Sequence, residues 1–284
     1  MTAVVSYAYA VVRDAPELEE VLTGLSGVSG APVHLVRSEG RDGPAAAVSP
    51  VPASEFGEDA LRSHLEDLDW LEATARAHHR VVEALAERTT VLPLRLVTVY
   101  LDDERVRSML EGRRDAFGSR LDELASRAEW GVKVFVDEPA AQAPAGPPPA
   151  GEPSPGRAYL NRRRTQRAAR ETTYRHAGQA AERIESAARP YAVGRVRHRP
   201  QQGGIAPRTG ENVTNDAYLV PLRHTEEFRA GVARAADGLT GVRIEITGPW
   251  APYSFVAPDT PEDRDPETPV DRDPETPVDE GKAP

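Results

Sequence analysis

The stretch VVSYAYAVV at residues 4–12 begins the pattern that decides the fold. Its larger side chains alternate with smaller ones, which is typical of a β-strand. The alternating positions are Val5, Tyr7, Tyr9 and Val11. Working outward, helical spacing and turn residues predict a helix near 16–25, strands at 33–37 and 45–49, a long helix over 59–87 and a strand at 93–100. This order, βαββαβ, is that of the ferredoxin-like unit.

The second half of the chain repeats this order. Its apolar patterns predict a strand at 132–136, a helix over 156–189, strands at 191–198 and 217–222, a helix over 224–237 and a strand at 242–247. Between the halves, residues 102–128 have the apolar spacing of a helix. We therefore predict an α+β protein with two ferredoxin-like units, residues 1–100 and 129–256, joined by a helical segment over 101–128.

Two segments have compositions that do not suit a packed core. Residues 138–156 are rich in proline, and we interpret them as a loop inserted into the second unit. They could instead mark a domain boundary, which would leave the strand at 132–136 with the first half. The sequence DRDPETPV at 263–270 recurs unchanged at 271–278. We predict that residues 257–284 form a disordered acidic tail.

The tail also dominates the charge balance. The 284 residues include 35 basic and 45 acidic side chains, a net charge of −10 with neutral histidine. Residues 257–284 hold ten acidic and three basic residues, so most of the excess lies in this segment. The remaining body is close to neutral, which does not favour a general affinity for polyanions.

The chain contains no cysteine. This excludes disulfide frameworks, thiolate zinc sites and cysteine nucleophiles, and it suits a reducing compartment. The first residues lack a basic leader, and their apolar run of about ten residues is too short for a membrane span. We expect a soluble, cytoplasmic protein without a membrane span.

Motifs for catalysis or for a cofactor are absent from the sequence. It contains no H-E-x-x-H, G-x-S-x-G or G-x-x-x-x-G-K-[ST] pattern. His78 and His79 point about 100° apart on a helix, so they cannot ligate one ion together. We therefore predict a protein that is not an enzyme and holds no cofactor or metal. A cofactor-independent enzyme or small-ligand regulator remains an alternative, because this fold hosts many functions.

A basic cluster lies in the predicted helix over 156–189. Its members are Arg162, Arg163, Arg164, Arg167 and Arg170. On a βαββαβ fold such a cluster suggests RNA binding, which is a second alternative. The predicted third strands carry at most one stacking aromatic residue, however, and we expect no nucleic-acid partner. We expect these arginines to face solvent while Ala169, Thr173, Ala177, Ala180, Ile184 and Ala187 pack on a sheet.

The strands at 132–136 and 242–247 indicate a sheet with one open face. Val242, Ile244 and Ile246 alternate with Arg243 and Glu245. This pattern predicts helices on one face and a charged face on the other, which is either a docking surface or simply solvated. The following segment, TGPWAPYSF at 247–255, contains three large aromatic rings. They either fold back over the core or anchor a partner.

Four separated segments resemble the gas vesicle protein L/F family (GvpL/GvpF). They are the opening YAYAVV, AHHRVVEALAERTTVLPLRLVTVY at 77–100, AYLNRRR at 158–164 and GPWAPYSF at 248–255. The resemblance runs from about residue 4 to 256, and Val97 departs from it by standing where a glycine is expected. The candidate family-motif or partner-binding positions are His78, Pro93, Leu94, Arg95, Tyr159, Leu160, Arg162, Arg163, Trp250, Tyr253 and Phe255.

The resemblance implies a non-enzymatic accessory protein of gas vesicle formation. It implies binding to the small hydrophobic shell protein, to other accessory proteins, or to both, during nucleation or assembly. It also implies a cytoplasmic protein associated with gas vesicles.

Overall fold

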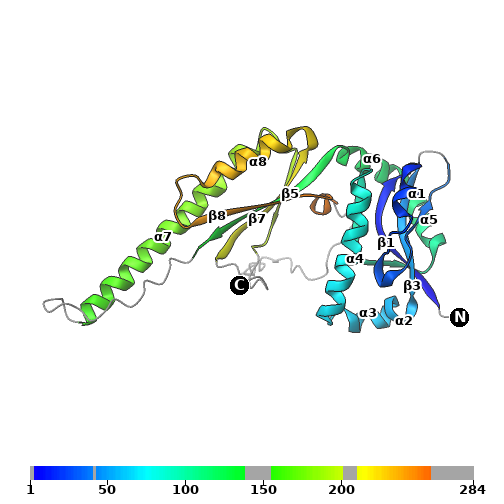
Figure 1. Cartoon of the computed structure of the whole chain (residues 1–284), viewed down its shortest axis with the longest axis horizontal. Coiled ribbons are helices and arrows are strands. Elements are labelled where there is room, and N and C mark those ends of the chain that lie inside the picture. The colour runs from blue at the N-terminus through cyan, green and yellow to red at the C-terminus, as the bar shows by residue number, and fades with distance from the viewer. Residues whose placement is uncertain (1–2, 41–42, 138–154, 201–209, 257–284) are drawn as a thin grey trace, which may run out of the picture.

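The computed structural model describes residues 3–40, 43–137, 155–200 and 210–256. The repeat-containing segment at 257–284 and nearly all of the proline-rich segment at 138–156 lie outside the described residues, so the predictions made for them stay predictions. Figure 1 shows an elongated molecule with one sheet and its helices at each end. We call residues up to 124 the first unit and residues from 127 the second unit.

The first unit contains a four-stranded antiparallel sheet in the order β2-β3-β1-β4. Its strands are β1 (Val4–Arg13), β2 (His34–Arg37), β3 (Pro44–Pro52) and β4 (Val91–Tyr100). Its helices before β4 are α1 (Glu17–Leu22), the 3-10 turn η1 (Val28–Gly30), α2 (Ala53–Phe56), α3 (Glu58–His64) and α4 (Leu68–Ala86). The long helix predicted over 59–87 is therefore wrong as a single element. The chain breaks before α4, where the Asp67 side chain accepts from the Asp69 and Trp70 amides as the N-cap.

The second unit contains a four-stranded antiparallel sheet in the order β6-β7-β5-β8. Its strands are β5 (Arg127–Val136), β6 (Gly194–His198), β7 (Glu211–Pro221) and β8 (Val242–Trp250). Its helices are α7 (Pro155–Ala188), η2 (Leu222–His224), α8 (Thr225–Ala233), η3 (Arg234–Ala236) and η4 (Tyr253–Phe255). Two antiparallel sheets with the same strand order confirm the predicted mixture of helix and sheet. Assignment of each unit to the ferredoxin-like class stays a prediction.

The segment predicted as a helical connector consists of two helices, α5 (Asp103–Gly112) and α6 (Arg114–Leu124). Both pack on the first sheet, on the face opposite α1 and α4. Their apolar side chains share one core cluster with that face of β1, β2 and β3. The members from α5 and α6 are Val106, Leu110, Phe117, Leu121 and Leu124. The first sheet is therefore covered by helices on both faces.

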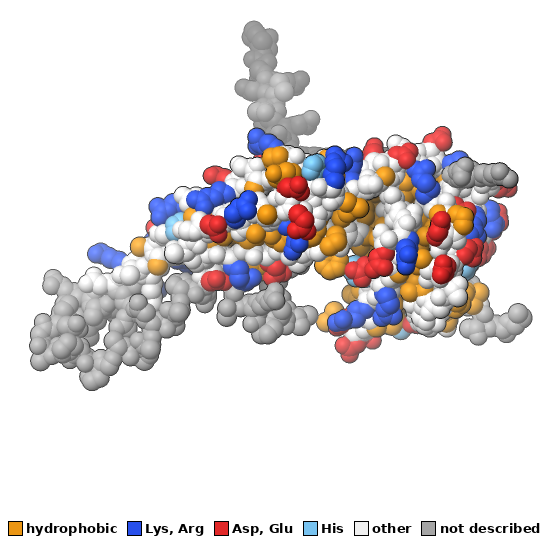
Figure 2. Space-filling view, turned by 45° about the horizontal axis from the view of Figure 1, so that its top comes forward, with side chains coloured by type: hydrophobic (Ala, Val, Ile, Leu, Met, Phe, Trp, Pro, Cys, Tyr) orange, Lys and Arg blue, Asp and Glu red, His pale blue; other side chains and the backbone are white. Residues whose placement is uncertain are grey.

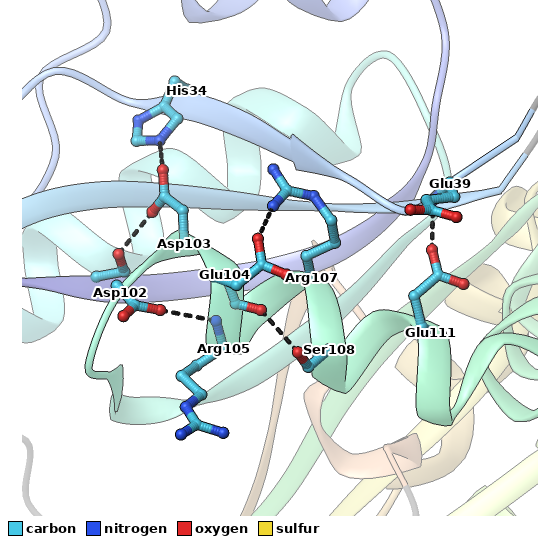
Figure 3. Close-up of polar contacts among 10 residues, drawn as sticks. His34, Glu39, Asp102, Asp103, Glu104, Arg105, Arg107, Ser108 and Glu111 are labelled. Atoms are coloured by element: carbon cyan, nitrogen blue, oxygen red, sulfur yellow. Dashed lines mark hydrogen bonds and ion pairs between the residues drawn. The ribbon is translucent and has the colours of Figure 1, made fainter.

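Polar contacts fix the start of α5 against β1 and β2 (Figure 3). Asp103 accepts from Ser6 Oγ over 2.6 Å and lies 2.8 Å from His34 Nε2. Although partial burial acts in the opposite direction, these two contacts lower the pKa of Asp103. Asp102 caps the helix by accepting from the Arg105 amide over 2.8 Å.

A β-bulge at Tyr9 changes the alternation predicted for β1. Ala8 pairs with Val48 and Ala10 with Ala47, so Tyr9 has no residue opposite it in β3. Tyr7 and Tyr9 face α1 and α4, but Val11 lies in the cluster with α5 and α6. The prediction that Val11 shares the face of the tyrosines is wrong, because one extra residue moves the following side chains to the other face.

The second sheet has helices on one face. Trp130, Val132 and Val134 of β5 pack with buried residues of α7 and α8. The predicted alternation of β8 holds, since Ile244 and Ile246 contact this core. On the other face the Arg243 guanidinium lies 4.4 Å from the centre of the Phe135 ring.

Candidate functional site

The aromatic segment at 250–255, which we call the closing segment, crosses from the second unit to the first. Trp250 ends β8 opposite Glu129, and Ala251 is buried in the core of the first unit with 5% of its surface exposed. Tyr253 packs against the same core, and Phe255 packs against the cluster of α5 and α6. The prediction that these rings fold back over a core therefore holds, but the core belongs mainly to the other unit.

Two adjacent histidines of helix α4, His78 and His79, contact the closing segment. The Tyr253 ring lies 6.4 Å from the His78 ring and 6.0 Å from the His79 ring. The Trp250 ring lies 5.5 Å from the His79 ring. These contacts join the end of the second unit to α4, and we call this region the junction.

His78 faces inward from α4 and is 3% exposed. Its Nδ1 lies 3.0 Å from Tyr7 Oη, and the Val97 amide donates to the same oxygen over 3.1 Å. Because that oxygen already accepts from the amide, we assign the phenolic proton to the bond with Nδ1. Burial, reinforced by His79 and opposed in part by the Leu94 backbone, lowers the pKa of His78 to about 4. The ring is therefore neutral near pH 7.

The predicted strand at 93–100 contains a wide bulge at its motif residues. Pro93 pairs with Ala10 and Thr98 with Ala8, so residues 94–97 have no paired residue in β1. Within the bulge Leu94 packs inward while Arg95 and Leu96 are exposed. Val97 has a φ of 64°, a left-handed conformation in which glycine is favoured. Glycine adopts this conformation without a steric penalty, which is a structural reason for the glycine expected at this position. Val97 adopts it at a cost in free energy.

Glu129 of β5 holds the closing segment from the side of the second unit. Its carboxylate accepts from the Ser254 amide over 2.7 Å and from Ser254 Oγ over 2.6 Å. His198 Nε2 lies 2.9 Å from the same hydroxyl. Burial raises the pKa of Glu129, although the two bonds from Ser254 oppose the shift.

Two adjoining clefts lie beside the closing segment. The larger, of about 590 Å³, is lined by the end of α4, by Leu222 and by Pro249, Trp250 and Pro252. The smaller, of about 330 Å³, is lined by Val193, Leu219 and Phe255 among others. Leu124 and Arg127 line both. Leu222 is 56% exposed and Val193 is 54% exposed, so apolar side chains reach solvent at the rims. Figure 2 shows apolar side chains gathered along the boundary between the two units.

The structure brings most of the predicted site residues together at the junction. His78, Pro93, Leu94, Trp250, Tyr253 and Phe255 lie in or against the contact of α4, β4 and the closing segment, with Arg95 on the exposed bulge. The remaining four lie on α7, away from the junction. Leu160 and Arg163 are exposed there, and the side chains of Tyr159 and Arg162 lie outside the described residues.

Sequence reasoning missed His79 as an aromatic contact and Glu129 as the anchor of Ser254. The predicted strand began at residue 132, whereas β5 begins at Arg127. Extending the alternation back from Val132 to Trp130 would have placed Glu129 on the opposite face. The rim residues Leu222 and Val193 carry no signal in the sequence, because single exposed apolar residues are common.

The architecture defines a class of protein for which solved structures exist. One is the crystal structure of gas vesicle protein GvpF from Anabaena sp. PCC7120, with a TM-score of 0.62 and 20% identity, covering 89% of this chain and 96% of that one. Another is GvpF from Microcystis aeruginosa, with a TM-score of 0.58 and 20% identity, covering 89% and 99%. At this identity the likeness establishes a shared fold.

Sequence comparisons give the family. Gas vesicle protein L of Streptomyces sp. (strain CB03234) is 42% identical over 252 residues, which cover 88% of this chain and 91% of that protein. Gas vesicle protein F of the same strain is 27% identical over 267 residues, covering 88% and 99%. The family described as gas vesicle synthesis protein GvpL/GvpF matches residues 5–257, and this chain belongs to it. The predicted resemblance is confirmed, and membership supports a role in gas vesicle formation.

The described residues contain no cluster suited to a metal ion and no helix suited to a membrane crossing. In the described ranges no cluster of three or more His, Cys, Asp or Glu is arranged to hold a metal ion. Across the same ranges, no helix combines the length and apolar character that a membrane crossing requires.

Proposed function

We propose that the protein is a non-enzymatic accessory protein that binds the hydrophobic gas vesicle shell protein during nucleation or assembly. Other accessory proteins of the same gene cluster are the next candidates as partners. Subunits that build an air-facing wall expose large apolar surfaces before assembly, and such surfaces aggregate unless they are covered. The protein acts by covering or orienting that subunit in the cytoplasm, close to the growing vesicle.

The pair of clefts at the junction supports this proposal. They combine Trp250, proline rings and exposed aliphatic rims in one place. Concave apolar surfaces with an aromatic anchor are the usual receptors for apolar segments of a partner. The charged side chains Glu83, Glu87 and Arg127 in the cleft walls keep the unoccupied surface hydrated.

The architecture supports a scaffold role without chemistry. We propose that both units are ferredoxin-like, because each has the order βαββαβ and an antiparallel sheet with the first strand between the third and the fourth. The one strongly buried histidine, His78, contributes to the core, where its Nδ1 is bonded to Tyr7. A buried, neutral ring engaged in this way supports the core and does not require a substrate.

The proposal is tested by co-expression of the full chain with the shell protein of its gene cluster. We expect soluble co-purification that survives 1 M salt, because apolar contacts are not screened. The double variant L222E/V193E places two charges at the cleft rims. It should reduce the recovered shell protein by about tenfold or more, since burying an unpaired carboxylate costs more than about 1.4 kcal/mol.

The matched control is L68E/L101E, which changes two residues that are 74% and 71% exposed and lie outside both clefts. It should co-purify the shell protein like the wild type. Equal losses in both double variants would remove the clefts as the docking site. If the shell protein precipitates while the wild-type chain stays free, direct binding is wrong, and the other accessory proteins are tested next.

A further inference from the structure

Helix α7 extends well beyond the sheet on which it packs. Its buried residues begin at Ala177 and continue with Ala180, Ile184 and Ala188. The predicted packing stripe is therefore wrong at Ala169, which is exposed. From residue 160 to 171 every described side chain is exposed. Figure 1 shows this part of α7 projecting past the ends of the strands, and we call residues 155–176 the arm.

The arm carries a high density of positive charge. Residues 155–176 contain seven arginines and one acidic residue, Glu171. Arg163, Arg167 and Arg170 follow one another at spacings of four and three, so they share one face of the helix. Like charges at these spacings destabilise a helix, and the described side chains from 160 to 171 are all exposed, so core packing does not compensate there.

Two arginines of the arm form ion pairs with acidic side chains of the described residues. Arg167 Nε lies 3.1 Å from Glu171, and Arg170 Nη2 lies 3.7 Å from Glu211. The arginine side chains in these pairs are 84% and 69% exposed, so water screens both pairs. A polyanionic segment laid along the arm would complement its net charge of +6, seven arginines minus one glutamate.

We propose that the arm binds the second acidic repeat of the same chain, residues 271–278. Each repeat, DRDPETPV, places acidic residues at its first, third and fifth positions. In an extended polyproline conformation these side chains are about 6 Å apart along the axis. Residues four apart on a helix, such as Arg163 and Arg167, are also about 6 Å apart along its axis. The two segments therefore present charges at similar intervals along their axes, with successive acidic side chains distributed around the polyproline axis.

The chain beyond Val256 is long enough for the second repeat to reach the arm. The last described residue, Val256, packs with the cluster of α5 and α6 at the junction, whereas Tyr174 of the arm bonds Glu211 at the opposite end of the sheet. The length of β5 and the rise of α7 from Tyr174 to Arg167 separate these points by about 45 Å. About 15 residues in polyproline conformation cover that span, and the second repeat begins 15 residues after Val256. Covalent attachment then gives the repeat an effective concentration in the millimolar range.

The absence of cysteine makes the full chain suitable for a labelling test. The variant Q166C/T276C carries one label on the arm and one in the second repeat. We expect strong energy transfer between the labels at 0.1 M salt and about half as much at 1 M. The reason is that the screening length falls from about 10 Å to about 3 Å.

Three charge variants of the labelled chain test whether arm and repeats attract each other. R163Q/R164Q/R167Q should lower the transfer at 0.1 M salt to the value of the 1 M sample. Neutralising the six acidic residues of the repeats to Asn and Gln should have the same effect without altering the arm. The control R62Q/R76Q/R80Q removes three exposed charges from α3 and α4 and should leave the transfer unchanged.

Three outcomes would overturn the proposal. The first is transfer that does not respond to salt, and the second is transfer that survives neutralisation of the repeats. The third is transfer between chains in a mixture of singly labelled Q166C and T276C proteins, which would make a second copy the occupant. Circular dichroism of the arm variant separates loss of docking from loss of helix. Failure here leaves the shell-protein proposal untouched, because the arm and the clefts share no residue.

Discussion

The two sheets have the same strand order but different coverings. The first sheet lies between α1 and α4 on one face and α5 and α6 on the other. The second sheet packs on α7 and α8 with one face, and the closing segment covers only part of the other. The difference arises from the segment that comes after each βαββαβ unit along the chain. Two amphipathic helices come after β4, whereas the described residues after β8 form the short closing segment.

The two units therefore differ in how completely their described sheets are buried. Burial on both faces makes the first unit a rigid support, in which β1 is fully buried from Tyr7 to Val12. The second unit keeps an incompletely covered sheet, a projecting helix and the closing segment that inserts into its neighbour. The features on which the two proposals rest, the arm and the clefts, therefore lie in the second unit and at the junction.

The largest expected effect comes from truncating a buried side chain of α5, one of the two helices that cover the second face of the first sheet. Leu110 of α5 is fully buried, so L110A should destabilise the protein by about 2–5 kcal/mol through lost burial and the cavity left behind. Lys133 lies on the face of the second sheet that no described helix covers, and K133A should change stability by about 1 kcal/mol or less. Urea unfolding measures both. Equal effects would mean that α5 is not part of the core.

Acid should loosen the junction through His78. Its pKa is lowered from 6.5 to about 4, so the stability that it contributes is present above pH 6.5 and is lost as the pH falls toward 4. The loss amounts to about 3 kcal/mol at most. Thermal unfolding of wild type and H78Q between pH 7 and 4 should show a steeper decline for the wild type. H224Q is the control, and a wild-type slope shared by H78Q would contradict this role.

Glu129 should act in the opposite direction with pH. Burial raises the pKa of Glu129 in the folded state. Its contribution to the free energy of unfolding is therefore largest at low pH and declines as the pH rises through the folded-state pKa. The stability advantage of wild type over E129Q should therefore shrink between pH 4 and 7. E129A should cost about 1–3 kcal/mol, because the partly buried Ser254 amide loses its acceptor. An advantage that grows with pH would show that Glu129 is stabilised as the anion.

The smallest effect concerns the half-exposed contact of Asp103 with His34. The lowered pKa of Asp103 means that its contribution is present above pH 3.8 and is lost as the pH falls further. D103N should cost about 1 kcal/mol at pH 7, since it weakens the contacts with Ser6 and His34. H34Q should reproduce part of this loss. Full stability in both variants would show that apolar packing alone fixes α5.

Local patterns predicted the order of the elements but not their breaks. Alternation at Tyr7 and Tyr9 and the helical spacing of Val82 and Leu85 are short-range signals, so the strands and most of α4 could be predicted from them. The bulges at Tyr9 and at residues 94–97 could not, because a bulge is defined by the strand opposite. The same holds for β8, which continues past the predicted end at residue 247 to pair Trp250 with Glu129.

The site shows the same division. The sequence by itself determined the family motifs, the aromatic character of the closing segment, the acidic repeats and the absence of cysteine, since these depend on residue identity alone. Only the tertiary structure decided that Tyr253 meets His78, which lies 175 residues earlier in the chain, and that α5 and α6 cover the first sheet. Packing against any complementary apolar surface lowers the free energy of an apolar or aromatic side chain. Its identity therefore predicts that it will be buried, and only the packing of distant segments selects the surface that buries it.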